Sequence, residues 1–361
     1  MNTDHTIEIE SINDQSKLSY ANSGINIEDT DDVKEGMKES LKTSDNRVLN
    51  SIGAFASLYD FNFPEYEHPI MVMKTEEPGS KQKLAFQHGR VRSICYDMIN
   101  HLINDIIVMG AKPLAVQDAI ICGAIEKEVI REIVDAVSSA CREQDCTLTG
   151  GETSIQPGVL EKGAYILTSS IVGVVDKAKV IDGSAIRNGD IVIAIESNGI
   201  HTNGYTLVRA IMDKHPEILD KTVGSDSFFD AIMKPHLCYY KPLRGLFGRE
   251  ELHGMAHITG GGIVGNLGRV LPDGLNAHID LSKINVLPLF RLMHEVSHVE
   301  EAEMLRTFNM GVGMIVVAAP EFAQVVISHL SQFELRSYPI GEISLGDKQV
   351  VLEGKLEWTR E

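Results

Sequence analysis

Helical and strand-like patterns of apolar residues alternate along this chain, and this alternation restricts the folds open to it. Apolar residues recur at helical spacing over 92–108, and a second amphipathic helix is predicted over 126–142. Strand-like runs are predicted before and after these helices, at 70–73 and 165–175. Helices and strands in this order favour an α/β fold, in which helices bury their apolar faces against a sheet.

The alternation continues in the second half of the chain. Further strands and helices are predicted there, the strands at 190–196, 314–318 and 337–343 and the helices at 205–212 and 321–331. The charged, glycine-containing stretch 176–189 separates the two sets, and 361 residues are enough for about two domains. We therefore expect three parts, which are an acidic leader over 1–50, an N-terminal domain over 51–180 and a C-terminal domain over 181–361.

The charge of the chain argues against two classes of partner. The sequence holds 33 Lys and Arg residues against 51 Asp and Glu residues, which gives a net charge of −18. Nucleic acids and anionic membranes bind clustered cations, so we expect neither as a partner, whereas a small-molecule substrate needs only a few local cations. The apolar run 310–320 is too short for a membrane span of about 20 residues. Five scattered cysteines without a CxxC pair are typical of the reducing cytoplasm.

Five short segments combine small residues with a carboxylate, an amide or an imidazole, the groups that ligand and metal sites use. The first is 74–81, where the backbone N–H groups of Gly79 and Ser80 and the ammonium of Lys81 suit a phosphate. The carboxylate of Glu76 in the same segment suits a metal ion. A hydrophilic hairpin loop is the alternative interpretation of this segment.

The second segment is a polar stripe on the predicted helix over 92–108. Asp97, His101, Asn104 and Asp105 lie at offsets of 0, 4, 7 and 8, so they share one helix face. Such a stripe is commonly the solvated side of an amphipathic helix. Mg²⁺ bound between a protein and nucleotide phosphates needs only one or two carboxylates, however, and this face could supply them.

Two glycine-containing segments each have a ligand-binding interpretation and a plain one. In 149–153, Gly150 and Gly151 precede Glu152, either in a tight turn or against a ligand. In 257–263, three consecutive glycines open a helical pattern, and they either cradle an anion or form a flexible loop.

The remaining segment, 197–205, lies between a predicted strand and a predicted helix. It places His201 and Asn203 at the carboxyl end of a strand, where α/β proteins tend to bind ligands. His201 could act as an acid or base, or donate a hydrogen bond to a phosphate. A single histidine in a loop is also often incidental, so this residue has two interpretations.

Together and in this order, the segments resemble the aminoimidazole ribonucleotide synthetase family, whose members are also called phosphoribosylformylglycinamidine cyclo-ligases. The resemblance extends from about Lys17 to Leu352. Two matching segments, 257–262 and 306–314, are specific to this family within its superfamily. The other matching segments are 18–20, 23–25, 104–105, 110–114, 150–153, 157–158, 201–209 and 269–272.

The resemblance implies a two-domain chain of the α/β class, of the α+β type. Its N-terminal mixed sheet would pair with the sheet of a second subunit to form a barrel in a homodimer, and its C-terminal domain would be an α/β sandwich. The implied reaction belongs to purine biosynthesis: with ATP and Mg²⁺, the enzyme closes the ring of formylglycinamidine ribonucleotide, a phosphoribosyl amidine. The formamide oxygen is phosphorylated to an iminophosphate, and the amidine nitrogen then attacks that carbon and expels phosphate.

On the basis of this resemblance, the candidate residues take three roles. The expected metal ligands are Glu76, Asp97, Asp105 and Glu152. The expected catalytic residues are His201, Asn203 and Lys81. The residues expected to bind the nucleotide are Thr75, Glu76, Gly79, Ser80, Asn104, Gly150, Gly151, Thr153, Gly260 and Gly261.

Two segments depart from the family pattern. The family's Gly-Thr-Asp-Gly-Val-Gly-Thr-Lys corresponds to 74–81, where Glu76 replaces the aspartate and Glu77 replaces a glycine. A glycine-rich stretch upstream keeps only Gly53 and Phe55 of its pattern. Two alternatives stay open. One is another ATP-dependent phosphotransferase or dehydratase of the superfamily, and the other, motivated by these departures, is a catalytically weakened paralogue that binds a nucleotide.

Overall fold

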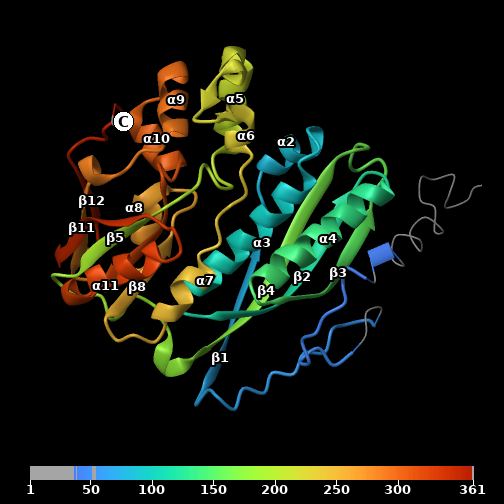
Figure 1. Cartoon of the computed structure of the whole chain (residues 1–361), viewed down its shortest axis with the longest axis horizontal. Helices are drawn as coiled ribbons and strands as arrows, with labels where there is room; N and C mark the ends of the chain where they lie inside the picture. Colours follow the sequence, from blue (N-terminus) through green and yellow to red (C-terminus); the bar gives the residue numbers. More distant parts are fainter. Residues whose placement is uncertain (1–35, 38, 51–53, 360–361) are drawn as a thin grey trace, which may run out of the picture.

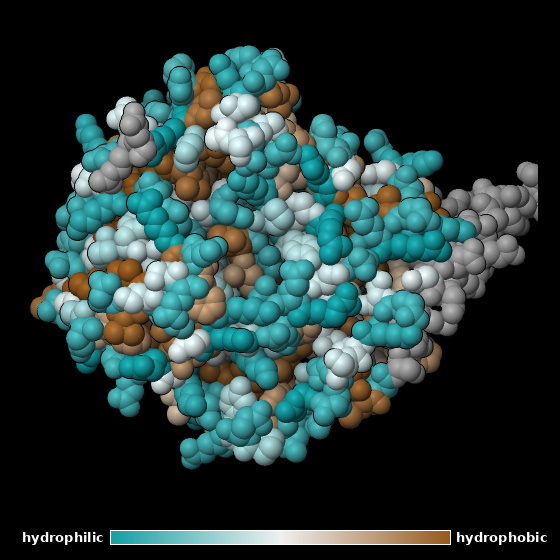
Figure 2. All heavy atoms as spheres, viewed as in Figure 1, coloured by the Kyte–Doolittle hydropathy of each residue, from teal (hydrophilic) through white to brown (hydrophobic). Residues whose placement is uncertain are grey.

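Two β-sheets that share no strand organise the residues described by this computed structural model, which are 36–37, 39–50 and 54–359 (Figure 1). The first sheet, drawn in blue to green, lies with its helices beside the second half of the chain, drawn in yellow to red. Figure 2 shows mostly hydrophilic residues over the face of the molecule that it views, in keeping with the high net charge. Within the described ranges, no helix combines the length and apolar character needed to cross a membrane.

The first sheet is mixed and has the spatial order β1, β4, β2, β3. Its strands are β1 (Pro69–Glu76), β2 (Lys112–Cys122), β3 (Thr147–Ile155) and β4 (Tyr165–Asp176). The β2–β3 pair is parallel, whereas β1–β4 and β2–β4 are antiparallel. The helices that pack on this sheet are α2 (Lys81–Gln87), α3 (Val91–Ile107) and α4 (Lys127–Glu143).

Among the described residues, little covers the face of this sheet opposite the helices. Residues alternate along a strand between the two faces of a sheet, and on the open face Met71 and Met73 are 48% and 71% exposed. One end of the face is covered, because Phe63 packs against Leu114 and Val174. An apolar and partly uncovered sheet face is uncommon on a stable monomer.

The second sheet has the spatial order β12, β9, β11, β5, β10, β8 and is antiparallel except for the β12–β9 pair. Its strands are β5 (Ile191–Glu196), β8 (Leu252–His257), β9 (Leu275–Asp280), β10 (Val312–Ala318), β11 (Ser337–Leu345) and β12 (Val350–Glu353). All residues of β8 and β10 are buried, so this part of the sheet is covered on both faces.

Helices and short turns surround the second sheet. The helices are α5 (Tyr205–Lys214), α6 (Phe228–Ile232), α7 (Tyr240–Leu243), α8 (Gly262–Leu267), α9 (Pro288–Ser297), α10 (Glu301–Thr307) and α11 (Pro320–Ser331). A small hairpin joins β6 (Thr222–Val223) to β7 (Asp226–Ser227). The 3₁₀ turns are η1 (Lys177–Lys179), η2 (Pro216–Asp220), η3 (Arg244–Leu246) and η4 (Leu281–Lys283).

The α/β class and the main helices and strands expected from the sequence are confirmed. Helix α3 begins and ends within one residue of the predicted 92–108. The first sheet ends at Asp176 and the second begins at Ile191, so position 180 falls in the connection between them. The domain limits themselves stay a prediction.

Two local predictions are wrong. The segment 74–81 is not one loop, because β1 continues to Glu76 and α2 already begins at Lys81. The segment 149–153 is not a tight turn, because it lies inside β3. In both places a strand continues through residues that the composition assigned to a turn.

The polar face of α3 is buried, which corrects the interpretation of this stripe as a solvated surface. It packs against an irregular segment from the second half of the chain. Asn104 Nδ2 donates to the Leu237 carbonyl oxygen (2.7 Å), and the Tyr239 backbone N–H donates to Asn104 Oδ1 (2.9 Å). The His236 backbone N–H donates to Asp97 Oδ1 (2.8 Å). The two halves of the chain are therefore joined by hydrogen bonds that satisfy buried polar groups.

A buried ion pair lies at the same junction. The Lys81 ammonium is 2.7 Å from Asp97 Oδ2, and both side chains are fully buried. The ammonium also donates to the carbonyl oxygens of His201 (3.1 Å) and Lys234 (2.8 Å). Burial raises the pKa of Asp97 and lowers the pKa of Lys81, and their mutual attraction opposes both shifts.

Replacing Asp97 with alanine should lower the free energy of unfolding by about 3–5 kcal/mol, because the Lys81 ammonium would stay buried without its carboxylate. Urea denaturation of the wild type and the variant measures this difference. Asp273→Ala is the matched control, since Asp273 forms an exposed ion pair with Lys348 and should contribute at most about 1 kcal/mol. Equal stability losses in the two variants would contradict the buried pair.

Candidate active site

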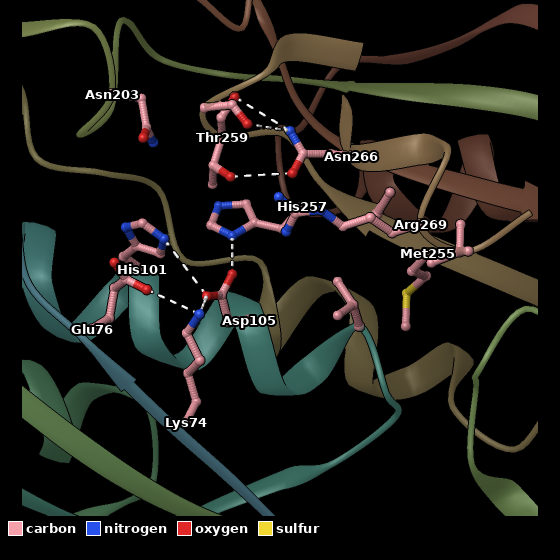
Figure 3. A pocket seen from close by; sticks show the side chains of 14 residues that line it. Lys74, Glu76, His101, Asp105, Asn203, Met255, His257, Thr259, Asn266 and Arg269 are labelled. Carbon is pink, nitrogen blue, oxygen red and sulfur yellow. Dashed lines mark hydrogen bonds and ion pairs between the residues drawn. The ribbon is translucent and has the colours of Figure 1, made fainter. Parts of the chain in front are cut away.

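A cavity of about 430 Å³ lies between the two halves of the molecule. Figure 3 shows side chains from β1 and α3 on one side, and from β8, α8 and the loops around them on the other. The lining residues are Lys74, Glu76, His101, Asp105, Val108, Asn203, Met255, Ala256, His257, Thr259, Gly260, Asn266, Arg269 and Val270. The site therefore depends on how α3 holds the two halves together.

Two carboxylates in the cavity converge on one cation. The Lys74 ammonium is 3.0 Å from Glu76 Oε2 and 3.0 Å from Asp105 Oδ2. Burial would raise the pKa of Asp105, but the hydrogen bond from His257 and the nearby positive charges hold it well below its usual range. Burial lowers the pKa of Lys74, and the hydrogen bonds to Asp105 and Glu76 outweigh that effect and raise it.

The second oxygen of Asp105 is bonded to a histidine. His257 Nδ1 lies 2.7 Å from Asp105 Oδ1, and His257 Nε2 lies 2.9 Å from His236 Nε2. His101 Nδ1 lies 2.9 Å from the Thr202 hydroxyl. Burial lowers the pKa of His101 to about 4. The inner wall of the cavity thus carries the imidazole rings of His101 and His257, with the ring of His236 bonded behind them.

His201 lies just behind this wall. Its backbone φ is +67°, and its ring stacks on that of His236 with centroids 3.8 Å apart. Among the described residues, neither ring nitrogen of His201 has a hydrogen-bond partner, although both are buried. Burial lowers the pKa of His201 well below its usual range. An unpaired buried polar group costs about 1–3 kcal/mol, so the arrangement calls for an explanation.

The second half of the chain supplies amides and a cation to the cavity. Figure 3 shows Asn203 and Thr259 on the side opposite Lys74. Asn266 Nδ2 donates to the carbonyl oxygens of Gly262 (2.8 Å) and Gly260 (3.2 Å), which fixes the triple-glycine loop. Positive φ angles at the last two of its glycines explain why the loop needs this residue type.

The structure brings some of the expected site residues together. Glu76, Asp105, Asn203 and Gly260 all line the cavity, although they come from distant parts of the sequence. Gly261 follows directly as the N-cap of α8, with φ of +93°. His201 does not line the cavity, but one of its ring nitrogens lies within 4.8 Å of ligand nitrogens of the cavity's histidine wall.

Other expected site residues have structural partners instead. Lys81 and Asp97 form the buried ion pair, and all three donors of the ammonium are directed at oxygens. Asn104 bonds to the backbone of the second half of the chain. Thr75 Oγ1 is 2.7 Å from the Ser170 hydroxyl, and Ser80 Oγ is 3.4 Å from the Thr206 hydroxyl. This geometry gives no support to a metal or phosphate role for Lys81 or Asp97.

The residues Gly150, Gly151, Glu152 and Thr153 lie on β3, at the opposite edge of the first sheet from β1. They do not line the cavity within this chain. Gly151 faces Asp118 on β2, and a Cβ atom at Gly151 would lie 1.8 Å from Asp118 Oδ1. The glycine therefore makes room for a carboxylate, which is a structural reason for its presence.

Sequence reasoning missed several side chains of the site. His236 is a single histidine in an irregular segment, where no spacing pattern points to it. Arg269 falls in a segment that matched the family, but nothing marked it as a cavity residue. Lys74 and His257 were inside candidate segments without a role. Gly53 of the altered glycine stretch lies outside the described residues.

Comparison with known proteins defines the class of protein. The family model "AIR synthase related protein, N-terminal domain" matches residues 66–175, and "AIR synthase related protein, C-terminal domain" matches residues 187–353. The matches cover more than half of the chain, so the chain belongs to this family.

Two similar proteins carry the same name. A phosphoribosylformylglycinamidine cyclo-ligase from Alkaliphilus metalliredigens is 37% identical over 93% of this chain and 98% of its own length. The protein of the same name from Chromobacterium violaceum is 40% identical over 90% of this chain and 95% of its own. The family expected from the sequence is thereby confirmed.

Solved structures share the fold at low identity. HypE from E. coli aligns with a TM-score of 0.65 at 15% identity, over 90% of this chain and 94% of its own. A hydrogenase maturation protein HypE in complex with ATP aligns with a TM-score of 0.62 at 17% identity, over 86% and 87%. At such identity the likeness concerns the fold alone.

We expect Asp118 to make the stability of the protein depend on pH. The residue as a whole is half-buried, but its carboxyl Oδ2 is fully enclosed and has no hydrogen-bond partner in the described part of the chain. Burial raises the pKa of this carboxyl to about 7. The folded state keeps its carboxyl proton up to about pH 7, whereas the unfolded chain releases it near its ordinary pKa of about 4. The stability contributed by this group is therefore complete below about pH 4 and is lost as the pH rises through about 7. Between pH 5 and pH 8, the free energy of unfolding should therefore fall by about 2 kcal/mol less in Asp118→Asn than in the wild type.

Urea denaturation at both pH values measures this effect, and Asp273→Asn at the surface is the control. Identical pH dependence of the wild type and Asp118→Asn would show that the carboxyl is ordinary.

Proposed function

We propose that this protein is a cyclo-ligase that uses ATP to convert formylglycinamidine ribonucleotide into aminoimidazole ribonucleotide, with ADP and phosphate as the other products. The observation that carries the proposal is the near-complete match to relatives named phosphoribosylformylglycinamidine cyclo-ligase, at 37–40% identity. Such an enzyme serves purine biosynthesis. Its five cysteines are all free, which suits the cytoplasm where we expect it to work.

The cavity suits the chemistry of phosphoryl transfer. This reaction depends mainly on positioning the reactants and stabilising charge on the transferred group. Lys74 and Arg269 supply cations from opposite halves of the chain, and Asn203, with the backbone N–H groups near Gly260, supplies donors. A fold relative was solved in complex with ATP, so this fold can accommodate that nucleotide.

The two carboxylates of the cavity fit a magnesium ion. Glu76 Oε2 and Asp105 Oδ2 already share one cation, the Lys74 ammonium, which shows that they converge on a single point. Mg²⁺ is commonly bound by one or two carboxylates together with phosphate oxygens, where it neutralises phosphate charge. We assign Glu76 and Asp105 to this ion and leave Lys81 and Asp97 outside the site.

Ring closure needs the amidine substrate held with its nitrogen near the formamide carbon. Bringing reacting atoms into contact and excluding water can supply much of the rate enhancement. The position of the cavity between two halves of the chain provides walls on both sides of a bound ribonucleotide. In this proposal the histidine wall limits the depth of the cavity, and the polar rim binds phosphates.

Asp105→Asn should lower kcat by roughly 10²–10³-fold, the usual effect of removing one group that stabilises developing charge. The assay follows ADP and imidazole formation from purified protein, ATP, Mg²⁺ and the amidine substrate. Asp273→Asn is the control with the same chemical change at the surface.

Three outcomes decide between the candidates. ADP release without imidazole product would reject the cyclo-ligase and favour another phosphotransferase of the superfamily. Nucleotide binding without turnover would favour the weakened paralogue, for which the pairing of both carboxylates with Lys74 is the specific observation. An unchanged rate in Asp105→Asn would reject the assigned site.

We further propose that two chains associate through the open face of the first sheet. This face carries Met71, Met73 and Ile166, and each is at least 36% exposed in the single chain. Association would bury apolar surface that faces solvent here. It would also bring β3 of each chain, with Glu152 and its glycines, toward the partner sheet.

Met73→Lys should convert a dimer to a monomer, because a buried lysine would stand without a partner in the interface. Size-exclusion chromatography with light scattering measures the mass of the wild type and the variant. Leu345→Lys is the control, because Leu345 is 75% exposed on a strand of the other sheet. A monomeric wild type, or a dimer that persists in Met73→Lys, would refute this interface.

A further inference from the structure

Three histidines from separate parts of the second half of the chain come together at and behind the inner wall of the cavity. His201 follows β5, His236 lies between α6 and α7, and His257 ends β8. Each offers one ring nitrogen, and these nitrogens lie within 4.8 Å of one another. All three residues are buried, and His257 also lines the cavity.

We propose that His201, His236 and His257 form a binding site for a divalent transition-metal ion such as Zn²⁺. Imidazole nitrogens are preferred ligands of zinc and its neighbours among the transition metals, whereas Mg²⁺ prefers oxygen. The site is therefore distinct in chemistry from the carboxylate pair assigned to magnesium. It rests on the histidines alone and does not depend on the proposed cyclo-ligase activity.

Unpaired nitrogens are the first observation that points to a ligand. Both ring nitrogens of His201 and Nδ1 of His236 are buried without a hydrogen-bond partner among the described residues. Buried polar atoms are normally paired, so three such atoms in one cluster are unusual. A metal ion between the rings would give one nitrogen of His201 the partner that the protein does not supply, and it would bind His236 through Nε2 rather than through the unpaired Nδ1.

Asp105 prepares His257 as a ligand. Because His257 Nδ1 lies 2.7 Å from Asp105 Oδ1, its proton belongs on Nδ1, and Nε2 keeps a lone pair. A carboxylate that holds the outer nitrogen of a histidine is the usual support of a metal-binding imidazole. The other oxygen of the carboxylate, Oδ2, faces Lys74, so this support does not compete with the cation on that side.

Two of the three nitrogens are spaced close to what an ion needs. His236 Nε2 and His257 Nε2 are 2.9 Å apart. Two nitrogens about 2.0–2.1 Å from a tetrahedral zinc ion lie roughly 3.3 Å from each other, so these two rings need to move little. The His201 ring is stacked on that of His236 with centroids 3.8 Å apart, so it must turn out of the stack before its nitrogen can face the same ion. On binding, the proton of His236 would move from Nε2 to Nδ1, so that both Nε2 lone pairs face the ion.

Three protein ligands leave one coordination position for water or another ligand. Since His257 borders the cavity, an ion can reach the histidines from there, and its open position would face the same space. An ion at this place would also link the wall of the cavity to α3 through Asp105.

The test is metal binding by the full-length, untagged protein after treatment with a chelator. Co²⁺ is the probe, because tetrahedral Co²⁺ absorbs strongly in the visible range and six-coordinate Co²⁺ absorbs weakly. We expect about one Co²⁺ per chain with the tetrahedral spectrum, and loss of that spectrum when Zn²⁺ is added. A wild type that binds neither ion, or shows only the weak six-coordinate spectrum, would overturn the proposal.

A matched pair of variants locates the site. His236→Phe keeps a ring that can stack on His201 but removes both nitrogens, and it should weaken Co²⁺ binding by at least about tenfold. His278→Phe is the control, because His278 is bonded to Glu353 on the second sheet, away from the cavity. Equal Co²⁺ affinity of His236→Phe and the wild type would refute the assignment of the site. If the variant does not fold, the Co²⁺ spectrum of the wild type decides the proposal by itself.

Discussion

The contact between the polar face of α3 and the segment that follows α6 is the interaction on which the rest of the structure depends. Side chains of Asp97 and Asn104 bond to backbone groups of 236–239, and the fully buried Lys81 ammonium neutralises Asp97. Buried polar groups of this kind are costly when unpaired, so the two halves of the chain fit together in one relative position. The other end of the same helix face carries Asp105 into the cavity.

This arrangement explains why one carboxylate can serve two neighbours. Asp105 Oδ2 faces Lys74 and Glu76, and Asp105 Oδ1 holds His257. The first pair supports phosphate and magnesium binding in the proposed cyclo-ligase, and the second supports the proposed histidine metal site. Both sites lie where the halves meet, as ligand sites often do.

The sequence predicted the helices and strands better than the contacts that their side chains make. The apolar spacing of 92–108 located α3 within one residue, because burial of one helix face follows directly from local periodicity. For the polar face of the same helix, the sequence left a solvated surface and a metal site as alternatives and did not show its burial, since the backbone groups that it bonds lie more than 130 residues away in the chain. Glu76 and Asp105 were predicted as metal ligands and both line the cavity, whereas His236 behind the cavity wall was not singled out, because a single histidine in an irregular segment leaves no pattern. The glycines of β3 resembled a turn because composition alone does not show that Gly151 faces Asp118.

A crystal structure with Mg²⁺ and a non-hydrolysable ATP analogue tests the central claim most directly, because it locates the nucleotide. The account predicts density for the phosphates in the cavity between the two sheets, with the ion bound to Glu76 and Asp105 and with Lys74 beside the phosphates. Phosphates bound elsewhere, with Lys74 still paired to both carboxylates, would contradict it.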